Sequence, residues 1–296
     1  MFTADRWKDF EVIDSSDGER LERWGKYILV RPDPQVIWQD ARQASEWKKP
    51  NAHYHRSKEG GGSWQFFDLP ETWDIHYDLP DASRLTFRLK PFSFKHTGLF
   101  PEQAANWDWF SQIIRKAVHE GRQVKVLNLF AYTGGATLAA LASGASVTHV
   151  DASRGMVQWA RENADISGLS DKPVRWLVDD CSKFVEREIR RGNHYDAVIM
   201  DPPSYGRGPR GEIWKIEETL HPLIRKTVSL LSDEPLFFLI NSYTAGLSPA
   251  VMQYILLRAL PEGLRSRAEV TVGETCIPVS STGLALPSGS SVRVRF

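Results

Sequence analysis

Residues 125–151 read KVLNLFAYTGGATLAALASGASVTHVD, and the fold class is most clearly visible in this segment. An apolar run leads into the glycine pair Gly134-Gly135, an Ala/Leu-rich stretch of helical character follows, and a second β-rich run is closed by Asp151. The order strand, glycine turn, helix, strand and acid predicts one βαβ unit.

The glycine turn favours an adenosyl ligand that lacks a pyrophosphate. A dinucleotide turn needs glycines spaced as G-x-G-x-x-G, whereas only Gly134 and Gly135 are present here. Asp151 follows after about the expected interval of roughly 20 residues and is placed to accept hydrogen bonds from ribose hydroxyls. The turn therefore favours S-adenosylmethionine over NAD or FAD, and an ordinary α/β turn without a ligand remains the alternative.

The chain beyond residue 95 continues the alternation of strands and helices. Strand patterns occupy 174–178, 195–200, which is of the buried type, and 236–240, and helical patterns occupy 101–118, 154–168, 184–191, 215–231 and 249–260. Five strands alternating with helices predict an α/β fold with a doubly wound, mostly parallel sheet. Two β segments in the tail, 268–273 and 292–296, lie around a Pro/Ser/Gly-rich loop and predict one antiparallel edge strand.

Residues 1–95 have a different pattern and predict a small all-β domain, which leaves 96–296 as the second domain. Short β-type runs separated by turn residues lie at 26–31, 35–38, 53–56, 64–67, 75–77 and 85–89. The runs at 53–56 and 64–67 predict a hairpin with a glycine tip at 60–62.

The segment 41–58 of this β domain is basic and aromatic. It contains Arg42, Lys48, Lys49, Arg56 and Lys58 against Glu46 alone, interleaved with Trp47, His53, Tyr54 and His55. Cations contact phosphates and flat rings stack on bases, so this segment is a candidate RNA-facing edge. A solvated loop and hairpin is the alternative.

The composition limits the classes of partner. The formal net charge of the 296 residues is zero, so a nucleic acid must be bound through local patches. The two cysteines, Cys181 and Cys276, form neither a disulfide framework nor a zinc spacing. The charged first residues lack the apolar core of a signal peptide, and we expect a cytoplasmic protein without a membrane partner and without a metal.

Polar side chains follow the predicted strands at their carboxyl ends, where crevice ligands of such sheets bind. They are Asn128, Asp151, Asp179, Asp180, Asp201 and Asn241. We expect these groups to converge on one rim of the sheet.

The loop Asp201-Pro202-Pro203-Ser204-Tyr205 follows the fourth strand, next to the first, and suits methyl transfer to an exocyclic amine. The lone pair of such an amine is delocalised into the ring, and acceptors on its N–H groups localise it. The Asp201 carboxylate and the Pro202 carbonyl are candidate acceptors, Tyr205 is a candidate stacking partner for an extruded base, and Pro203 helps to stiffen the loop. A rigid turn without a catalytic role is the alternative.

These motifs together resemble the class I S-adenosylmethionine-dependent methyltransferases, within them the group of rRNA large-subunit methyltransferases I and K and their relatives. The resemblance extends from about residue 10 to the end, and the matching segments are 97–103 (TGLFPEQ), 128–135 (NLFAYTGG), 150–153 (VDAS), 179–180 (DD) and 201–208 (DPPSYGRG). It implies the seven-stranded sheet of that fold.

The resemblance also implies roles for individual residues. Phe100, Pro101 and Gln103 are expected to close over the methionine end of the cofactor, and Asn128 to Gly134, with Phe130, Tyr132 and Thr133, to line the methionine and the sulfonium. Asp151, with Ala152 and Ser153 beside it, is expected to hold the ribose, and Asp180 with Asp179 to meet the adenine amine. Asp201, Pro202, Pro203 and Tyr205 are expected to face the methyl group and the substrate.

One departure from the family bears on the reaction. Relatives that methylate cytosine C5 attack C6 with a cysteine after the fifth strand, where this chain reads Ile240-Asn241-Ser242. Nitrogen methylation of a base in ribosomal RNA is therefore the leading hypothesis. Methylation of cytosine C5, of a protein amide or of a small molecule, and a non-catalytic RNA-binding protein, remain alternatives.

Overall fold

The computed structural model describes residues 1–57, 61–92, 95–208 and 211–296, and the chain divides into two compact units. The α/β unit contains Met1–Phe2, Asn106–Thr275 and Ser288–Phe296. The β-rich unit contains Thr3–Ala105 and Cys276–Pro287. The predicted domain boundary after residue 95 stays a prediction, and residues 276–287 were not expected to pack with the N-terminal residues.

The α/β unit is built on a doubly wound sheet, as the strand and helix patterns predict. Its strands, in spatial order, are β1 (Phe2–Thr3), β16 (Glu269–Pro278), β17 (Ala285–Arg295), β15 (Phe237–Ser242), β12 (Ala197–Met200), β9 (Lys125–Leu129), β10 (Ser146–Asp151) and β11 (Val174–Val178). The five strands from β15 to β11 pair in parallel, and β17 pairs with β15 in antiparallel orientation.

Two details of the sheet differ from the prediction. The sheet has eight strands rather than seven, because the short strand β1 adds to its edge. The antiparallel strand β17 lies inside the sheet rather than at its edge, since β16 and β1 lie beyond it. The predicted Pro/Ser/Gly-rich loop is also shorter than expected, because β16 and β17 extend into it from its two ends.

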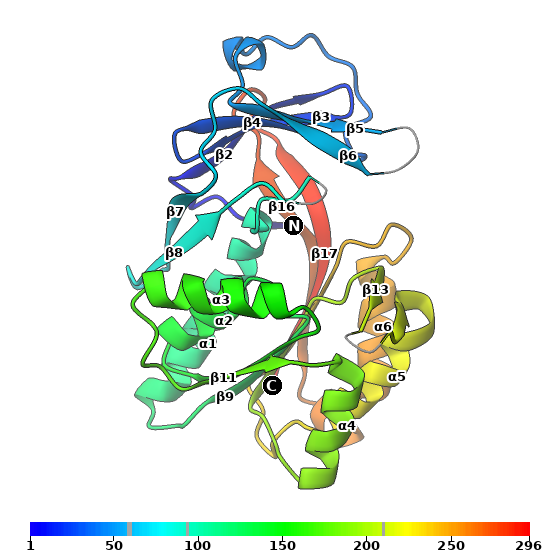
Figure 1. Cartoon of the computed structure of the whole chain (residues 1–296). Coiled ribbons are helices and arrows are strands. Elements are labelled where there is room, and N and C mark those ends of the chain that lie inside the picture. Colours follow the sequence, from blue (N-terminus) through cyan, green and yellow to red (C-terminus); the bar gives the residue numbers. More distant parts are fainter. Residues whose placement is uncertain (58–60, 93–94, 209–210) are drawn as a thin grey trace. The chain divides into compact units, whose positions relative to one another are not determined.

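Helices cover both faces of this sheet (Figure 1). One layer contains α1 (Ala104–His119), α2 (Gly135–Ala142) and α3 (Arg154–Ile166), and the other contains α4 (Cys181–Arg191), α5 (Ile216–Val228) and α6 (Pro249–Ala259), followed by the short α7 (Glu262–Arg265).

The alternation of side chains along each strand assigns them to the two layers. Leu127 and Leu129 join the core formed with α4, α5 and α6. On the opposite face, Phe110 of α1 stacks on Phe237, with ring centroids 5.8 Å apart. Asn128 also lies on this second face, a point that matters for the site.

The β-rich unit is a five-stranded sheet in the order β2-β3-β4-β5-β6, together with a separate two-stranded hairpin β7-β8. The elements are β2 (Phe10–Ser16), β3 (Glu19–Trp24), β4 (Tyr27–Pro32), the 3-10 turn η1 (Ser45–Lys48), β5 (Ala52–Arg56), β6 (Gly62–Phe66), β7 (Trp73–Asp78), β8 (Arg84–Leu89) and the 3-10 turn η2 (Pro101–Gln103). The predicted hairpin is confirmed by the antiparallel pairing of β5 and β6, and residues 58–60 of its tip lie outside the described residues.

The strand predicted at 35–38 is wrong. Pro34 and the Asp33 carboxylate start a turn there: Oδ1 of Asp33 accepts the N–H of Gln35 at 3.0 Å, and its carbonyl accepts the N–H of Val36 at 3.1 Å. The Asx turn therefore overrides the β propensity of this short run.

Strands β2 and β3 were missed because charged residues occupy their buried positions. Glu22 is fully buried, and its carboxylate accepts the Arg31 Nε and Nη2 hydrogens at 2.6 and 2.9 Å and the Trp24 indole at 3.1 Å. Arg20, also buried, pairs with Asp33 at 3.2 Å. Ion pairs in the interior hide the hydrophobic alternation on which strand prediction depends.

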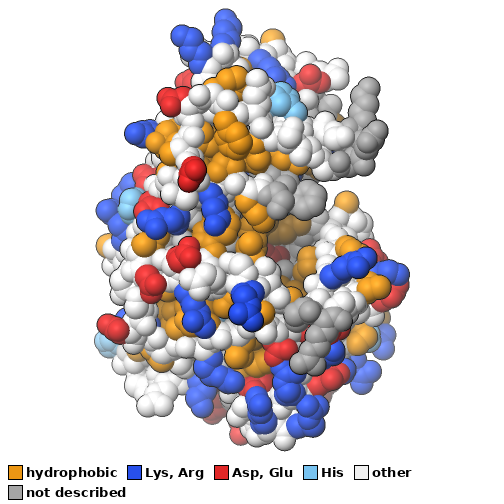
Figure 2. Space-filling view, viewed as in Figure 1, with side chains coloured by type: hydrophobic (Ala, Val, Ile, Leu, Met, Phe, Trp, Pro, Cys, Tyr) orange, Lys and Arg blue, Asp and Glu red, His pale blue; other side chains and the backbone are white. Residues whose placement is uncertain are grey.

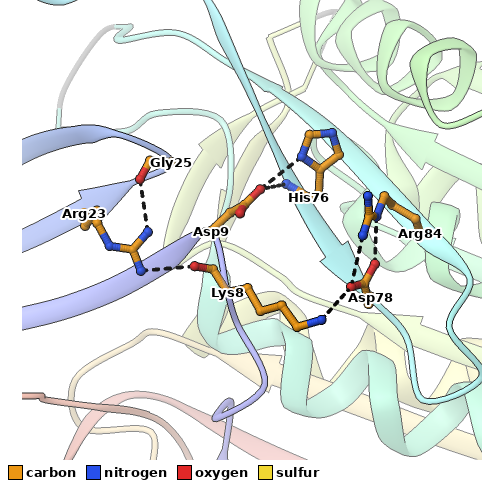
Figure 3. Close-up of polar contacts among 7 residues, drawn as sticks. All are labelled: Lys8, Asp9, Arg23, Gly25, His76, Asp78 and Arg84. Atoms are coloured by element: carbon orange, nitrogen blue, oxygen red, sulfur yellow. Dashed lines mark hydrogen bonds and ion pairs between the residues drawn. The ribbon is translucent and has the colours of Figure 1, made fainter.

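Polar contacts also join the two sheets within the β-rich unit (Figure 3). The Asp9 carboxylate accepts the backbone N–H of His76 at 2.9 Å, and Arg84 and Lys8 both donate to Asp78. These donors lower the pKa of Asp78 to about 2. Arg23 donates to the carbonyls of Lys8 and Gly25, which fixes the chain where it enters β2.

The buried Glu22 predicts a pH dependence of stability. Burial opposes its charge, but the two arginines lower its pKa from 4.5 to about 2. The unfolded chain binds this proton more readily, so the contribution of Glu22 is complete above pH 4.5 and is lost as the pH falls toward 2. We expect Glu22→Gln to lower the free energy of unfolding by about 3–5 kcal/mol at neutral pH, because it leaves buried arginines without their counter-charge.

Urea unfolding at a series of pH values measures both effects. The exposed Glu71→Gln is the matched control and should leave the free energy of unfolding unchanged. A Glu22→Gln variant with the same loss of stability in acid as the wild type contradicts the assignment.

Candidate active site

The loop after β9 has a strained backbone. Phe130 and Tyr132 have φ angles of 57° and 51°, a region that side-chain-bearing residues rarely adopt, and Gly134 follows at 89°. The N–H of Phe130 donates to Cys181 Sγ at 3.4 Å, and the N–H of Tyr132 donates to Asp151 Oδ2 at 2.8 Å. Such strain is held where the surrounding structure imposes it, typically at functional sites.

The Asp151 carboxylate fixes this loop from the end of β10. Its Oδ1 accepts the N–H of Ser153 at 2.8 Å while Oδ2 holds Tyr132, and burial raises the pKa of Asp151. Ser153 caps α3, because its hydroxyl accepts the N–H of Met156. The half-buried Ala152 lies between Asp151 and Ser153 in the chain. A carboxylate has about four acceptor positions, so two backbone bonds leave capacity for ribose hydroxyls.

The two glycines of the turn are required by packing within the protein. A Cβ atom on Gly134 would lie 2.9 Å from the Cβ of Ala160, and one on Gly135 would lie 2.6 Å from the Trp107 ring. The glycine pair therefore seats α2 tightly against α3 and α1. The carbonyl of Thr133 accepts the side-chain amide of Asn163 at 2.9 Å, which ties the same turn to α3.

The Asn128 side chain is buried between β9 and α2. It is 2% exposed, and its amide donates to Thr137 Oγ1 of α2 at 2.9 Å. Thr137 in turn contacts His149 Nδ1 at 2.9 Å, and burial lowers the pKa of His149 to about 3, so this imidazole is neutral. The side chain of Asn128 links β9 to α2, and its predicted contact with the cofactor stays a prediction.

Asp179 and Asp180 lie where β11 meets α4. Asp179 pairs with Arg187, and its N–H donates to the carbonyl of Asp151 at 2.9 Å. Asp180 caps α4, because its Oδ1 accepts the N–H of Lys183 at 2.8 Å. Both carboxylates thus have structural partners, and the role of this pair at adenine stays a prediction.

Asp201 lies beside the strained loop because of the strand register. Met200 is paired with Leu129 on one side and with Ile240 on the other, so the next residues of the three strands meet at the rim. The N–H of Asp201 donates to the Leu129 carbonyl at 3.4 Å, and its Oδ1 accepts the Asn241 amide at 3.0 Å. Asp201 and Asn241, both predicted at this rim, are in direct contact.

The DPPSY loop leads into a small hairpin of β13 (Tyr205–Arg207) and β14 (Ile213–Lys215), which the sequence did not predict. Trp214 of β14 is 8% exposed, donates its indole N–H to the Pro203 carbonyl, and packs 4.9 Å from the Phe130 ring. Tyr205 is 55% exposed, as a stacking residue would be. Pro202 is buried, so the loop is anchored directly after Asp201.

Three predicted cofactor residues belong to the β-rich unit. The Pro101 carbonyl accepts the Trp7 indole N–H at 2.9 Å, the Phe100 ring lies 5.4 Å from that of His96, and the Gln103 N–H donates to the Phe100 carbonyl at 3.1 Å. Their predicted closure over the methionine end stays a prediction.

In the described ranges, no group of three or more His, Cys, Asp or Glu is arranged to hold a metal ion. Within those same ranges, no helix is long and apolar enough to cross a membrane.

The doubly wound sheet, the left-handed loop after its first strand and the acid after its second define a Rossmann-like methyltransferase. Comparison with known proteins agrees, because the family model for S-adenosylmethionine-dependent methyltransferases matches residues 28–245. The chain belongs to this family, its cofactor is S-adenosylmethionine, and the remaining acceptor capacity of Asp151 fits the ribose of that cofactor.

Relatives of known structure support the assignment. The chain is similar to a SAM-dependent methyltransferase from Agrobacterium tumefaciens, with 34% identity, a TM-score of 0.88, and coverage of 98% of this chain and 91% of that one. A putative methyltransferase, SMU.776, complexed with SAH shares the fold at 17% identity and a TM-score of 0.72, over 98% of this chain and 76% of that one.

Curated relatives include two enzymes named ribosomal RNA large subunit methyltransferase K/L. The protein from Methylococcus capsulatus is 32% identical over 182 residues, which is 61% of this chain and 21% of that protein. The protein from Pseudoalteromonas atlantica is 34% identical over 147 residues, 49% of this chain and 19% of that protein. The chain thus spans about a fifth of the length of these relatives.

The position of Asp151 predicts a loss of cofactor affinity on neutralisation. In Asp151→Asn, one carboxylate oxygen becomes an NH₂ group that faces a backbone N–H, so the loop loses a charged acceptor. We expect the dissociation constant for S-adenosylmethionine to rise roughly 10- to 100-fold, which corresponds to a charged hydrogen bond of about 1.5–3 kcal/mol.

Isothermal titration calorimetry measures this constant. Asp165→Asn, an exposed position in the same unit, is the control and should keep the wild-type value. Unchanged binding by Asp151→Asn would remove Asp151 from the cofactor site.

Proposed function

We propose that this protein transfers a methyl group from S-adenosylmethionine to a nitrogen of a base in RNA, ribosomal RNA being the first candidate. The proposal is based on the position of the Asp201 carboxylate, which is oriented by Asn241 and lies next to the strained loop after β9. The names of the curated relatives supply the RNA substrate class.

The DPPSY loop provides acceptors for an amine. When bound, the cofactor supplies an electrophilic methyl group on a sulfonium. Asp201 and the Pro202 carbonyl would accept the N–H groups of the substrate amine, which localises the nitrogen lone pair. The transfer would break the methyl–sulfur bond, with S-adenosylhomocysteine as the leaving group, and would form the methyl–nitrogen bond. The cationic nitrogen must then lose one proton, which the Asp201 carboxylate would accept.

The state of the cysteines favours nitrogen over cytosine C5. Cys181 is buried, accepts the N–H of Phe130, and has a pKa raised by burial, so its thiolate is disfavoured. Cys276 is also buried, in the β-rich unit. The C5 enzymes of this group carry their nucleophile after the fifth strand, whereas in this chain Asn241, near the end of that strand, contacts Asp201.

The β-rich unit offers aromatic surface to RNA, though partly through different residues than those expected. In the basic segment, Arg42 pairs with Glu19 and lies 4.1 Å over the Trp47 ring, so both are used within the protein. The exposed rings are instead on the edge strand β6 and just after it, where Phe66 is 56% and Phe67 57% exposed. Edge-strand aromatics of this kind stack on unpaired bases.

Charges on the molecule fit a local rather than a global attraction to RNA. On the face shown in Figure 2, Lys and Arg side chains are interspersed with Asp and Glu, in keeping with a formal net charge of zero. Recognition would then depend on stacking more than on a continuous basic stripe. With ribosomal RNA as the substrate, we place the protein in the cytoplasm.

The Asp201→Ala variant tests the reaction. Purified protein is incubated with labelled cofactor and RNA, and the methylated nucleoside is identified by mass spectrometry. We expect Asp201→Ala to abolish transfer while cofactor binding stays within about tenfold of wild type, because the carboxylate serves the substrate. The exposed Asp171→Ala should retain full activity.

Three outcomes oppose the proposal. The first is that the cofactor-saturated wild type incorporates no labelled methyl group into RNA. The second is that the label enters protein or a small molecule instead, and the third is that the product is 5-methylcytosine. Full activity of Asp201→Ala would refute the assigned role of the loop.

Substitution of the exposed aromatics tests the RNA surface. We expect the Phe66→Ala/Phe67→Ala variant to raise KM for RNA roughly tenfold with little change in kcat, since stacking contributes about 1–3 kcal/mol per base. Leu284→Ala is the matched control, because Leu284 is 70% exposed in the same unit. Equal KM values for both variants would exclude this strand from RNA binding.

A further inference from the structure

A chain of four hydrogen bonds between side chains ends on Asp201. Arg293 Nε donates to Asn106 Oδ1 at 2.8 Å, and Asn106 Nδ2 donates to Ser291 Oγ at 3.0 Å. Ser291 Oγ donates to Asn241 Oδ1 at 2.7 Å, and Asn241 Nδ2 donates to Asp201 Oδ1 at 3.0 Å. We call these four bonds the Asp201 relay.

The two ends of the relay fix its direction. A guanidinium has only donors, so Asn106 must turn its oxygen to Arg293 and its NH₂ group to Ser291. An ionised carboxylate has only acceptors, so Asn241 must turn its NH₂ group to Asp201 and its oxygen to Ser291. The Ser291 hydroxyl then accepts on one side and donates on the other. Every amide orientation follows from the charges at the ends.

The relay is shielded from water. Asn106 and Ser291 are fully buried, Asn241 is 2% exposed and Arg293 is 8% exposed. The Arg293 guanidinium lies 3.7 Å from the centroid of the Phe2 ring, and burial lowers its pKa only to about 10, so it keeps its charge at neutral pH. In such a low-dielectric environment, bonds that all donate in the same direction polarise one another.

A relay of this kind is a costly way to stabilise a fold. Replacement of buried ionic and polar groups by apolar side chains of similar size is often neutral or stabilising, whereas a polar network can specify one conformation. This network specifies the orientation of the Asp201 carboxylate. It joins α1, β17 and β15 to the loop after β12, elements that are distant in the sequence.

We propose that Arg293, Asn106, Ser291 and Asn241 are positioning residues that set the orientation of the Asp201 carboxylate for methyl transfer. The proposal rests on the function proposed above, since it assigns the relay to the group that faces the substrate amine. None of the first three residues was singled out by the sequence, and none is required to touch cofactor or substrate.

Asn106→Asp tests the direction of the relay with almost no change in shape. The new carboxylate still accepts from Arg293 but cannot donate to Ser291, so the Ser291 hydroxyl turns toward it and Asn241 loses its donor. We expect kcat to fall roughly 10- to 100-fold, as on loss of groups that orient reactive ligands, while the affinity for cofactor stays within about twofold. Because the change adds an ion pair with Arg293, the thermal midpoint should not fall. A purely structural role predicts no loss of kcat under these conditions.

Ser291→Ala provides a second test should Asn106→Asp fail to fold. It interrupts the relay at its centre, and its control is Ser143→Ala, which removes a buried hydroxyl bonded to the Ala139 carbonyl in the same unit. We expect a fall in kcat of roughly tenfold or more for Ser291→Ala and a kcat within about twofold of wild type for the control. A kcat within about twofold of wild type for both Asn106→Asp and Ser291→Ala overturns the proposal.

A crystal structure of Asn106→Asp separates this proposal from the function. The relay predicts that the contact between Asn241 Nδ2 and Asp201 Oδ1 lengthens beyond about 3.5 Å, the limit of a hydrogen bond. If the wild type transfers nothing to RNA and the contact still lengthens, the relay stands and the proposed substrate is wrong. An unchanged contact with unchanged kcat refutes the relay.

Discussion

The hydrogen bond from the Tyr132 N–H to the Asp151 carboxylate is the constraint on which the site depends. It joins the ends of β9 and β10 and holds a non-glycine residue in the left-handed region. The Cys181 sulfur accepts the N–H of Phe130 and fixes the loop at a second point. The ring of Phe130 packs against Trp214, whose indole N–H donates to the Pro203 carbonyl. The loop after β9 and the DPPSY loop are therefore supported through one connected set of contacts.

Much of the fold could be predicted from sequence because its signals are local. Residues 125–151 carry a complete strand, helix and strand with their glycines and closing acid, so hydrophobic periodicity and turn chemistry agree over one short segment. The same rules failed where polar residues are buried. Glu22 and Arg20 lie at interior positions of β3 and pair with Arg31 and Asp33. The sequence pattern of that strand is therefore typical of an exposed segment.

The candidate site was predictable only at its strand ends. Asp201 and Asn241 each follow a buried apolar run, and parallel register brings such residues together, as their contact shows. Asn106 and Arg293 are separated by 187 residues and lie in a helix and a tail strand that carry no motif. The contact of Asn128 with Thr137 could not be predicted either, because the strand pattern alone does not show which helix layer faces this side chain.

Asn241, near the end of β15, connects the fold to the proposed chemistry. A cysteine there would offer a nucleophile to C6 of a pyrimidine, and the reaction would need no acceptor for an amine. An asparagine offers an amide with one donor and one acceptor direction, and here the donor meets Asp201 while the acceptor receives Ser291. In the proposed reaction, Asn241 would orient an acceptor for the substrate amine, and no residue would attack the base. The Asp201 carboxylate turns the amide donor of Asn241 toward itself, and the Arg293 guanidinium at the other end of the relay orients the Asn106 amide, so the two ends favour the same direction for the whole relay.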